Sequence, residues 1–130
     1  MLKDKLYQVN TIGLVRQDQE LPGVQKYIVS LSLDGSHDIF RGHFPGNPVL
    51  PGVCQVEMVR EAAEEISGKK LMLIQASQVK YLALINPSAN KQLSMSLKFT
   101  EAGQDEIDVT AEISSGETVF MKMKGRLKEL

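Results

Sequence analysis

The sequence has little of what marks several common classes of protein. Its 130 residues include one cysteine, Cys54, two histidines and no tryptophan. One cysteine cannot close an internal disulfide, and no cysteine and histidine cluster suggests zinc, so we expect no metal site. A formal net charge of −1 provides no overall basic field, which argues against binding to nucleic acid or to an anionic membrane.

Long apolar runs are also missing. No stretch approaches the roughly 20 apolar residues that a membrane-spanning helix needs. Residues 1–10 lack the apolar core of a signal peptide. We therefore expect a cytoplasmic protein that does not enter a membrane. With 42% hydrophobic and 24% charged residues, the chain fits one globular domain over residues 1–130.

Alternating apolar and polar residues predict most of the strands. In the clearest case, residues 92–100, four apolar side chains alternate with five polar or charged ones. Residues 71–85 are more continuously apolar, which predicts a more fully buried strand that ends before Pro87. Residues 6–16 are a weaker strand candidate, in which Gly13 is a candidate for a bulge. Three more segments have the two-residue period: residues 26–33, 107–113 and 119–123.

One helix is expected, over residues 53–67, with Gly68 as its C-terminal cap. The order of elements is then strand, strand, loop, helix and four strands. One helix against an antiparallel sheet is an α+β architecture, and a single sheet must curl around such a helix to cover its apolar faces.

The polar sector of this helix carries Glu57, Arg60, Glu61 and Glu64. From helix geometry alone, Glu57 is an ordinary surface carboxylate that pairs with Arg60 three residues later. The segment before the helix favours a second interpretation, in which Glu57 belongs to a catalytic site.

Residues 43–52 read HFPGNPVLPG, with three prolines and two glycines in ten positions. The prolines restrict the backbone, so His43 is attached to a stiff segment. Gly52 lies at the start of the expected helix, where unpaired N–H groups and the helix dipole favour negative charge. A histidine, backbone donors and a carboxylate thus lie within fifteen residues. These groups could serve as a base, an oxyanion site and an acid, respectively.

Residues 43–57, HFPGNPVLPGVCQVE, resemble the signature of the β-hydroxyacyl-acyl carrier protein dehydratases of fatty acid synthesis. That signature reads HFPG, a variable residue, proline, two residues and PG, followed by a helix. The helix carries a carboxylate fourteen positions after the histidine, as Glu57 lies after His43. The resemblance implies the hot-dog fold, an antiparallel sheet wrapped around one long central helix.

The resemblance also implies roles for residues. His43 is the general base, Glu57 the general acid, and the N–H of Gly52 the donor to the thioester carbonyl. The implied reaction dehydrates a 3-hydroxyacyl thioester on an acyl carrier protein to a trans-2-enoyl thioester, in fatty acid or related polyketide-type biosynthesis. It needs no cofactor.

In this family the histidine and the carboxylate of one site come from two subunits, which implies a homodimer or a multiple of dimers. The candidate walls of the acyl tunnel, each equally consistent with simple packing, are Phe44, Pro45 and Val49.

Two features depart from the family's pattern. Arg60 and Glu61 follow Glu57, where the family has small apolar residues and a glutamine. Arg60 would favour the charged form of Glu57, and Glu61 would oppose it. The segment LINPSANKQL, residues 84–93, also lacks the family's basic residue before proline and its PGD turn. These departures indicate a divergent relative.

Two other functions stay open: a hot-dog acyl thioesterase, and a non-catalytic subunit that binds acyl groups or supports assembly.

Simpler interpretations hold for other residues. His37 is a surface residue of a turn, and Cys54 is a small apolar residue of the helix. A basic segment is expected to be a solvated edge strand, or else to dock an acidic carrier protein. It comprises Lys122, Lys124, Arg126 and Lys128.

Overall fold

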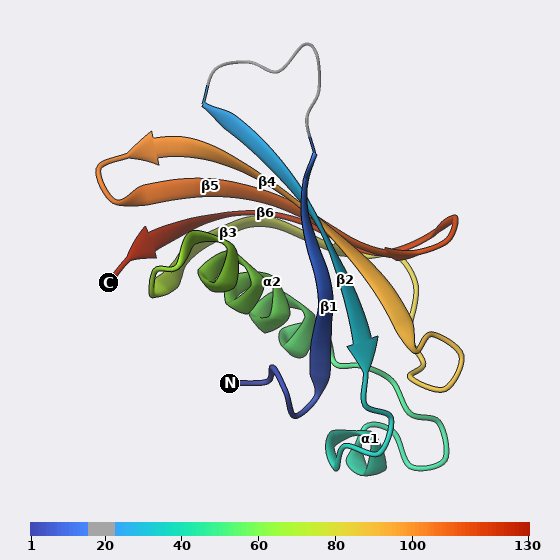
Figure 1. Ribbon diagram of the computed structural model, residues 1–130. Coiled ribbons are helices and arrows are strands. Elements are labelled where there is room, and N and C mark those ends of the chain that lie inside the picture. Colours follow the sequence, from blue (N-terminus) through green and yellow to red (C-terminus); the bar gives the residue numbers. More distant parts are fainter. Residues whose placement is uncertain (16–22) are drawn as a thin grey trace.

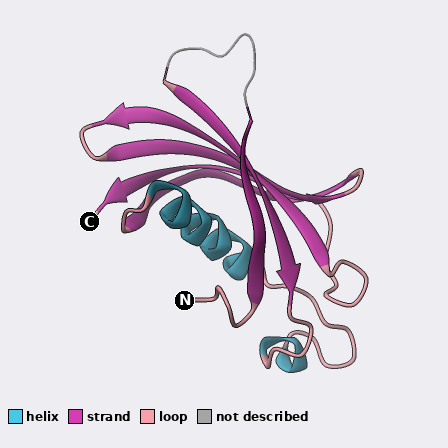
Figure 2. Ribbon diagram, viewed as in Figure 1, coloured by secondary structure: helices cyan, strands magenta, loops and turns pink. Residues whose placement is uncertain are grey.

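The computed structural model describes residues 1–15 and 23–130, and it has the expected hot-dog α+β fold. A curved antiparallel sheet surrounds one long helix, α2, on its concave side (Figure 1). The short helix α1 and the loop that follows it lie beyond the strands at one end of the sheet (Figure 2). The elements are β1 (Tyr7–Val15), β2 (Val24–Leu33), α1 (Ile39–Gly42), α2 (Gly52–Ser67), β3 (Leu71–Tyr81), β4 (Gln92–Gly103), β5 (Glu106–Ser115) and β6 (Thr118–Glu129).

The core lies between the sheet and α2, as the alternating patterns predict. On β4, Leu93, Met95 and Leu97 are each at most 4% exposed. Met58 and Ala63 of α2 are completely buried against this face. Helix α2 ends as expected, because Gly68 adopts a left-handed conformation with φ 71° and donates its N–H to a carbonyl of the last turn. No helix in the described part of the chain is long and apolar enough to cross a membrane.

The order of strands, β1-β2-β4-β5-β6-β3, corrects one expectation. The basic C-terminal strand β6 is not an edge strand, since it pairs with β5 on one side and with β3 on the other. The edges of the sheet are β1 and β3. Strand β3 precedes β4 in the sequence but pairs with β6 at the far edge of the sheet. Alternation within a strand cannot reveal such a pairing between distant segments.

Two local expectations also change. Gly13 pairs in regular register with Ile28 and forms no bulge; the irregularity of β1 lies between Val9 and Thr11. Strand β3 ends at Tyr81 rather than near residue 85, and most of its residues are exposed, so the expectation of a more fully buried strand was wrong. Residue 16 of the first expected strand lies outside the described residues.

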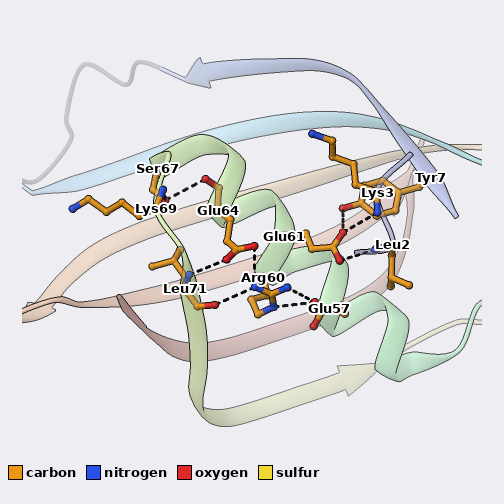
Figure 3. Close-up of polar contacts among 10 residues, drawn as sticks. All are labelled: Leu2, Lys3, Tyr7, Glu57, Arg60, Glu61, Glu64, Ser67, Lys69 and Leu71. Carbon is orange, nitrogen blue, oxygen red and sulfur yellow. Dashed lines mark hydrogen bonds and ion pairs between the residues drawn. The ribbon is translucent and has the colours of Figure 1, made fainter. Parts of the chain in front are cut away.

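Glu61 is not on a solvated face, although it lies in the polar sector of α2. Its side chain is 2% exposed because the N-terminal segment covers it. The carboxylate accepts hydrogen bonds from the Leu2 N–H at 2.8 Å, the Lys3 N–H at 2.9 Å and the Tyr7 hydroxyl at 2.9 Å (Figure 3). Burial opposes ionisation of Glu61, but these three donors together outweigh burial and lower its pKa. Glu61 therefore holds the N-terminal segment and β1 against α2.

The first residue of α2, Gly52, touches the edge strand. A Cβ atom at this position would lie 2.5 Å from Cζ and 2.6 Å from the hydroxyl oxygen of Tyr81, the last residue of β3. The ring of Tyr81 therefore lies against the backbone at the start of α2, and a side chain at position 52 would have to displace the end of that ring.

We expect the substitution Glu61→Gln to lower the free energy of unfolding by about 1–3 kcal/mol at neutral pH, because an amide cannot accept all three buried hydrogen bonds. The folded-state pKa of Glu61 lies below its unfolded value, so this stabilisation is present above the unfolded pKa and is lost as the pH falls through the folded one. Urea unfolding at several pH values measures it. Glu65→Gln, which affects an exposed pair with Lys3, is the matched control. Equal stability of Glu61→Gln and the parent at pH 7 would contradict this account.

We expect Gly52→Ala to lower the free energy of unfolding by at most about 1 kcal/mol, since the added methyl group overlaps the ring of Tyr81, whose half-exposed end can move aside. In a Tyr81→Ala background the same substitution should cost clearly less, because the ring is gone. Urea unfolding of the parent, both single variants and the double variant measures this coupling. An equal cost in both backgrounds would show that the contact does not constrain position 52.

Candidate active site

The loop between α1 and α2 positions His43 through main-chain hydrogen bonds. The Val49 N–H donates to the His43 carbonyl at 2.8 Å. The N–H of Phe44 donates to the Asn47 carbonyl, and the N–H of Asn47 donates to the Phe44 carbonyl. The next residue, Leu50, donates its N–H to the Ile85 carbonyl at 2.9 Å. The loop is thus closed on itself and attached to the segment that follows β3.

The imidazole of His43 is oriented by the same loop. Its Nδ1 lies 3.1 Å from the Val49 carbonyl oxygen. A carbonyl oxygen can only accept, so Nδ1 carries the hydrogen and the neutral ring leaves Nε2 as its basic nitrogen. The ring also stacks on Phe44, with centroids 4.2 Å apart. The side chain is half-buried. A fixed tautomer with an open Nε2 is the arrangement that a general base requires.

Gly52 offers a backbone donor about one turn before Glu57. It is the first residue of α2, so its N–H has no acceptor within the helix and lies at the positive end of the helix dipole. The Tyr81 ring lies beside this amide, and partial burial raises the pKa of the Tyr81 hydroxyl. A carbonyl oxygen that approaches Gly52 would therefore meet an amide donor and a neutral phenol.

Glu57 lies in the next turn of α2, and within one protomer it is bonded to Arg60. The Nε and Nη2 atoms of Arg60 both donate to Oε1 of Glu57 (Figure 3). The Glu57 side chain is 38% exposed. In the described part of the chain, His43 and Glu57 share no hydrogen bond. One protomer thus assembles the loop, His43 and the start of α2, and it leaves Glu57 in the surface pair that helix geometry alone predicts.

The other residues expected at the site fall into two groups. Val49 has a buried side chain, 6% exposed, and supplies the carbonyl that orients His43. Phe44, 52% exposed, and Pro45 lie on the surface of the protomer. Cys54 is buried, and burial raises the pKa of its thiol, which makes it a poor nucleophile.

Several contacts near the site were not expected from the sequence. Tyr81 contacts Gly52 from a strand 29 positions away in the chain, and no local signal marks it. Gln55 is 3% exposed, donates its amide to the Leu50 carbonyl at 3.3 Å and so links the loop to α2. The sequence offered one signal for this contact: Gln55 is a polar residue on the otherwise apolar face of the expected helix, so it needs a hydrogen-bond partner. Over the described residues, no group of three histidine, cysteine or acidic side chains could hold a metal ion.

The chain is similar to known dehydratases in sequence. It is 33% identical over 79 residues to the 3-hydroxyacyl-[acyl-carrier-protein] dehydratase FabZ of Lactiplantibacillus plantarum, a match that covers 55% of this chain and 53% of that protein. The chain therefore matches about half the length of this curated relative.

Two solved structures share the fold over nearly the whole chain. An uncharacterized protein from Erwinia carotovora subsp. atroseptica is 24% identical with a TM-score of 0.67, and the match covers 96% of both chains. The dehydratase heterocomplex ApeI:P from Xenorhabdus doucetiae is 22% identical with a TM-score of 0.59, covering 92% of this chain and 99% of that one.

The family model that describes the ApeI dehydratase matches residues 18–122. This span includes the loop that carries His43, the whole of α2, β3 to β5 and the start of β6. The chain therefore belongs to the ApeI-like dehydratase family.

Proposed function

We propose that the protein dehydrates 3-hydroxyacyl thioesters to trans-2-enoyl thioesters. The observation that carries this proposal is the fixed His43 ring, whose Nδ1 is bonded to the Val49 carbonyl and whose Nε2 is left as a base, in a chain of a dehydratase family. Its sequence relatives named as 3-hydroxyacyl-[acyl-carrier-protein] dehydratases support an acyl carrier protein as the carrier of the substrate.

The reaction divides into a base step and an acid step. His43 Nε2 takes the proton from C2 of the acyl chain, and the electron pair of that C–H bond becomes the C2–C3 double bond. The negative charge that develops on the thioester oxygen is stabilised by the Gly52 N–H. In other enzymes, removing one such donor slows catalysis about 10²–10³-fold. As the C3–O bond breaks, Glu57 donates a proton to the leaving hydroxyl group, which departs as water.

A second copy of the chain would complete the site. Strand β3 pairs only with β6 among the described strands, so its other edge is open. Large apolar side chains are exposed along and beyond this strand: Met72, Ile74, Tyr81, Leu82 and Leu84. An open edge bordered by apolar side chains favours pairing with the same edge of a second protomer. We propose a homodimer, or a multiple of dimers, in which His43 of one protomer acts with Glu57 of its partner.

The direct test is to incubate the purified protein with a 3-hydroxyacyl thioester of an acyl carrier protein and to follow enoyl absorbance and free thiol. We expect enoyl product without thiol, and a loss of about 10²–10⁴-fold in His43→Ala and in Glu57→Gln, because each removes one proton-transfer group. His37→Ala, at the other histidine of the chain, is the matched control and should keep the parent activity. Thiol release would indicate a thioesterase, and neither product a non-catalytic subunit; both results exclude the proposal.

Mixing the two inactive variants tests the shared site. After His43→Ala and Glu57→Gln protomers are dissociated together and reassociated, about half of the dimers should contain one of each. Each mixed dimer would have one complete site, so about a quarter of the parent activity should return. Mixed variants that stay inactive, although mass spectrometry detects the mixed dimer, would place both residues in the same protomer or rule out their cooperation.

A further inference from the structure

Arg60 occupies a central position between α2 and the beginning of β3. Its Nη1 donates to the Leu71 carbonyl at 3.0 Å and lies 2.9 Å from Oε1 of Glu64, while Nε and Nη2 donate to Glu57 (Figure 3). Glu64 in turn accepts the Leu71 N–H at 2.9 Å. The Arg60 side chain is 22% exposed, so this is not a loose surface pair. All three guanidinium nitrogens are engaged, which fixes the plane of the group.

Arg60 is bonded to only one of the two carboxylate oxygens of Glu57. Nε of Arg60 donates to Oε1 at 2.9 Å, and Nη2 donates to the same oxygen. Among residues 1–15 and 23–130, no donor is bonded to Oε2. An arginine that faces a free surface carboxylate commonly contacts both of its oxygens. Here the contacts to Glu64 and Leu71 hold the guanidinium so that only one oxygen of Glu57 is bonded.

We propose that Arg60 is a positioning residue for the dehydration: it fixes Oε1 of Glu57 and leaves Oε2 as the atom that carries the proton to the C3 hydroxyl group. This inference rests on the function proposed above, because it assigns the two oxygens of the acid in that reaction. A carboxyl group with one oxygen held cannot rotate freely, so its proton has a defined direction.

The charges around Glu57 identify Arg60 as the group that controls it. The acidic neighbours on α2 are Glu61 and Glu64, of which Glu61 is saturated by the N-terminal amides and Tyr7 of β1. Cys54 of α2 is neutral, because burial raises the pKa of its thiol. The hydrogen bond to Glu57 is the largest influence that raises the pKa of Arg60, so the guanidinium stays charged. Arg60 thus stays charged and holds the carboxyl group of Glu57 by one oxygen.

The test compares Arg60→Met, which removes both the charge and the fork of donors, with Arg60→Lys, which keeps the charge. In Arg60→Met we expect kcat to fall about tenfold with KM changed less than about twofold, since substrate binding does not use Arg60. In Arg60→Lys, which keeps the charge and a donor, kcat should lie between the values of the parent and of Arg60→Met. Glu65→Gln, an exposed acid on the same helix, should match the parent.

Two results would overturn the proposal: an unchanged kcat in Arg60→Met, or a change confined to KM that Arg60→Lys does not relieve. Urea unfolding of each variant checks that the protein is folded, since Arg60 also binds Leu71.

A measurement without substrate separates this inference from the proposed function. In protein labelled with ¹³C at glutamate carboxyl groups, the Glu57 signal is the one that Glu57→Gln removes. We expect its chemical shift at neutral pH to differ between the parent and Arg60→Met, because the guanidinium bonded to Oε1 is gone. If this signal does not move, Arg60 does not control Glu57, even in an active enzyme. If it moves but the parent forms no enoyl thioester, the proposed function fails, and with it the catalytic role of Arg60, while the contact itself stands.

Discussion

The hydrogen bond between the His43 ring and the Val49 carbonyl is the contact on which the candidate site depends. It joins two residues that also share a main-chain hydrogen bond, from the Val49 N–H to the His43 carbonyl. The main-chain bond closes the loop and keeps the Val49 carbonyl in place, so reorienting the imidazole would break the Nδ1 bond. Leu50 then attaches the loop to Ile85, and the buried amide of Gln55 attaches it to α2. The tautomer of His43 is therefore set by a main-chain oxygen, and the side chains of the loop can vary around it.

The acidic residues on one helix show how position in the fold separates roles. Glu61 is buried and accepts three hydrogen bonds, and its ionised form ties the N-terminal segment to α2. Glu64 accepts from Arg60 and from the Leu71 N–H, so it fixes the start of β3. Glu57 keeps one oxygen free and is half-exposed. Counting partners among the described residues, only Glu57 of these three has an unoccupied oxygen that could exchange a proton with a bound molecule, which agrees with its place in the dehydratase signature.

Local patterns in the sequence predicted the elements well, whereas contacts between distant elements were not predicted. The alternation in residues 92–100 is a local property of one strand, and β4 buries the expected side chains. The edge position of β3 was missed because strand order depends on pairing between segments far apart in the chain. The burial of Glu61 was missed for the same reason: helix periodicity places it in the polar sector, and only the N-terminal segment, some sixty residues away, covers it. The spacing of His43 and Glu57 marked the candidate site. It could not reveal that Tyr81 contacts Gly52, or that Arg60 bonds only one oxygen of Glu57.

Strand β3 links assembly to the chemistry of the site. Its first residue, Leu71, is held by Arg60 and Glu64, and its last residue, Tyr81, lies against Gly52. One strand therefore contacts both Arg60, which is bonded to Glu57, and Gly52, whose amide is proposed to bind the thioester oxygen. Its outer edge is unpaired among the described strands, and an unpaired edge is the less constrained side of a sheet. Pairing of this edge with a second protomer would order Leu71 and Tyr81 together, and so it would stiffen both ends of the candidate site at once. This arrangement gives a physical reason why the proposed site would be shared between two chains.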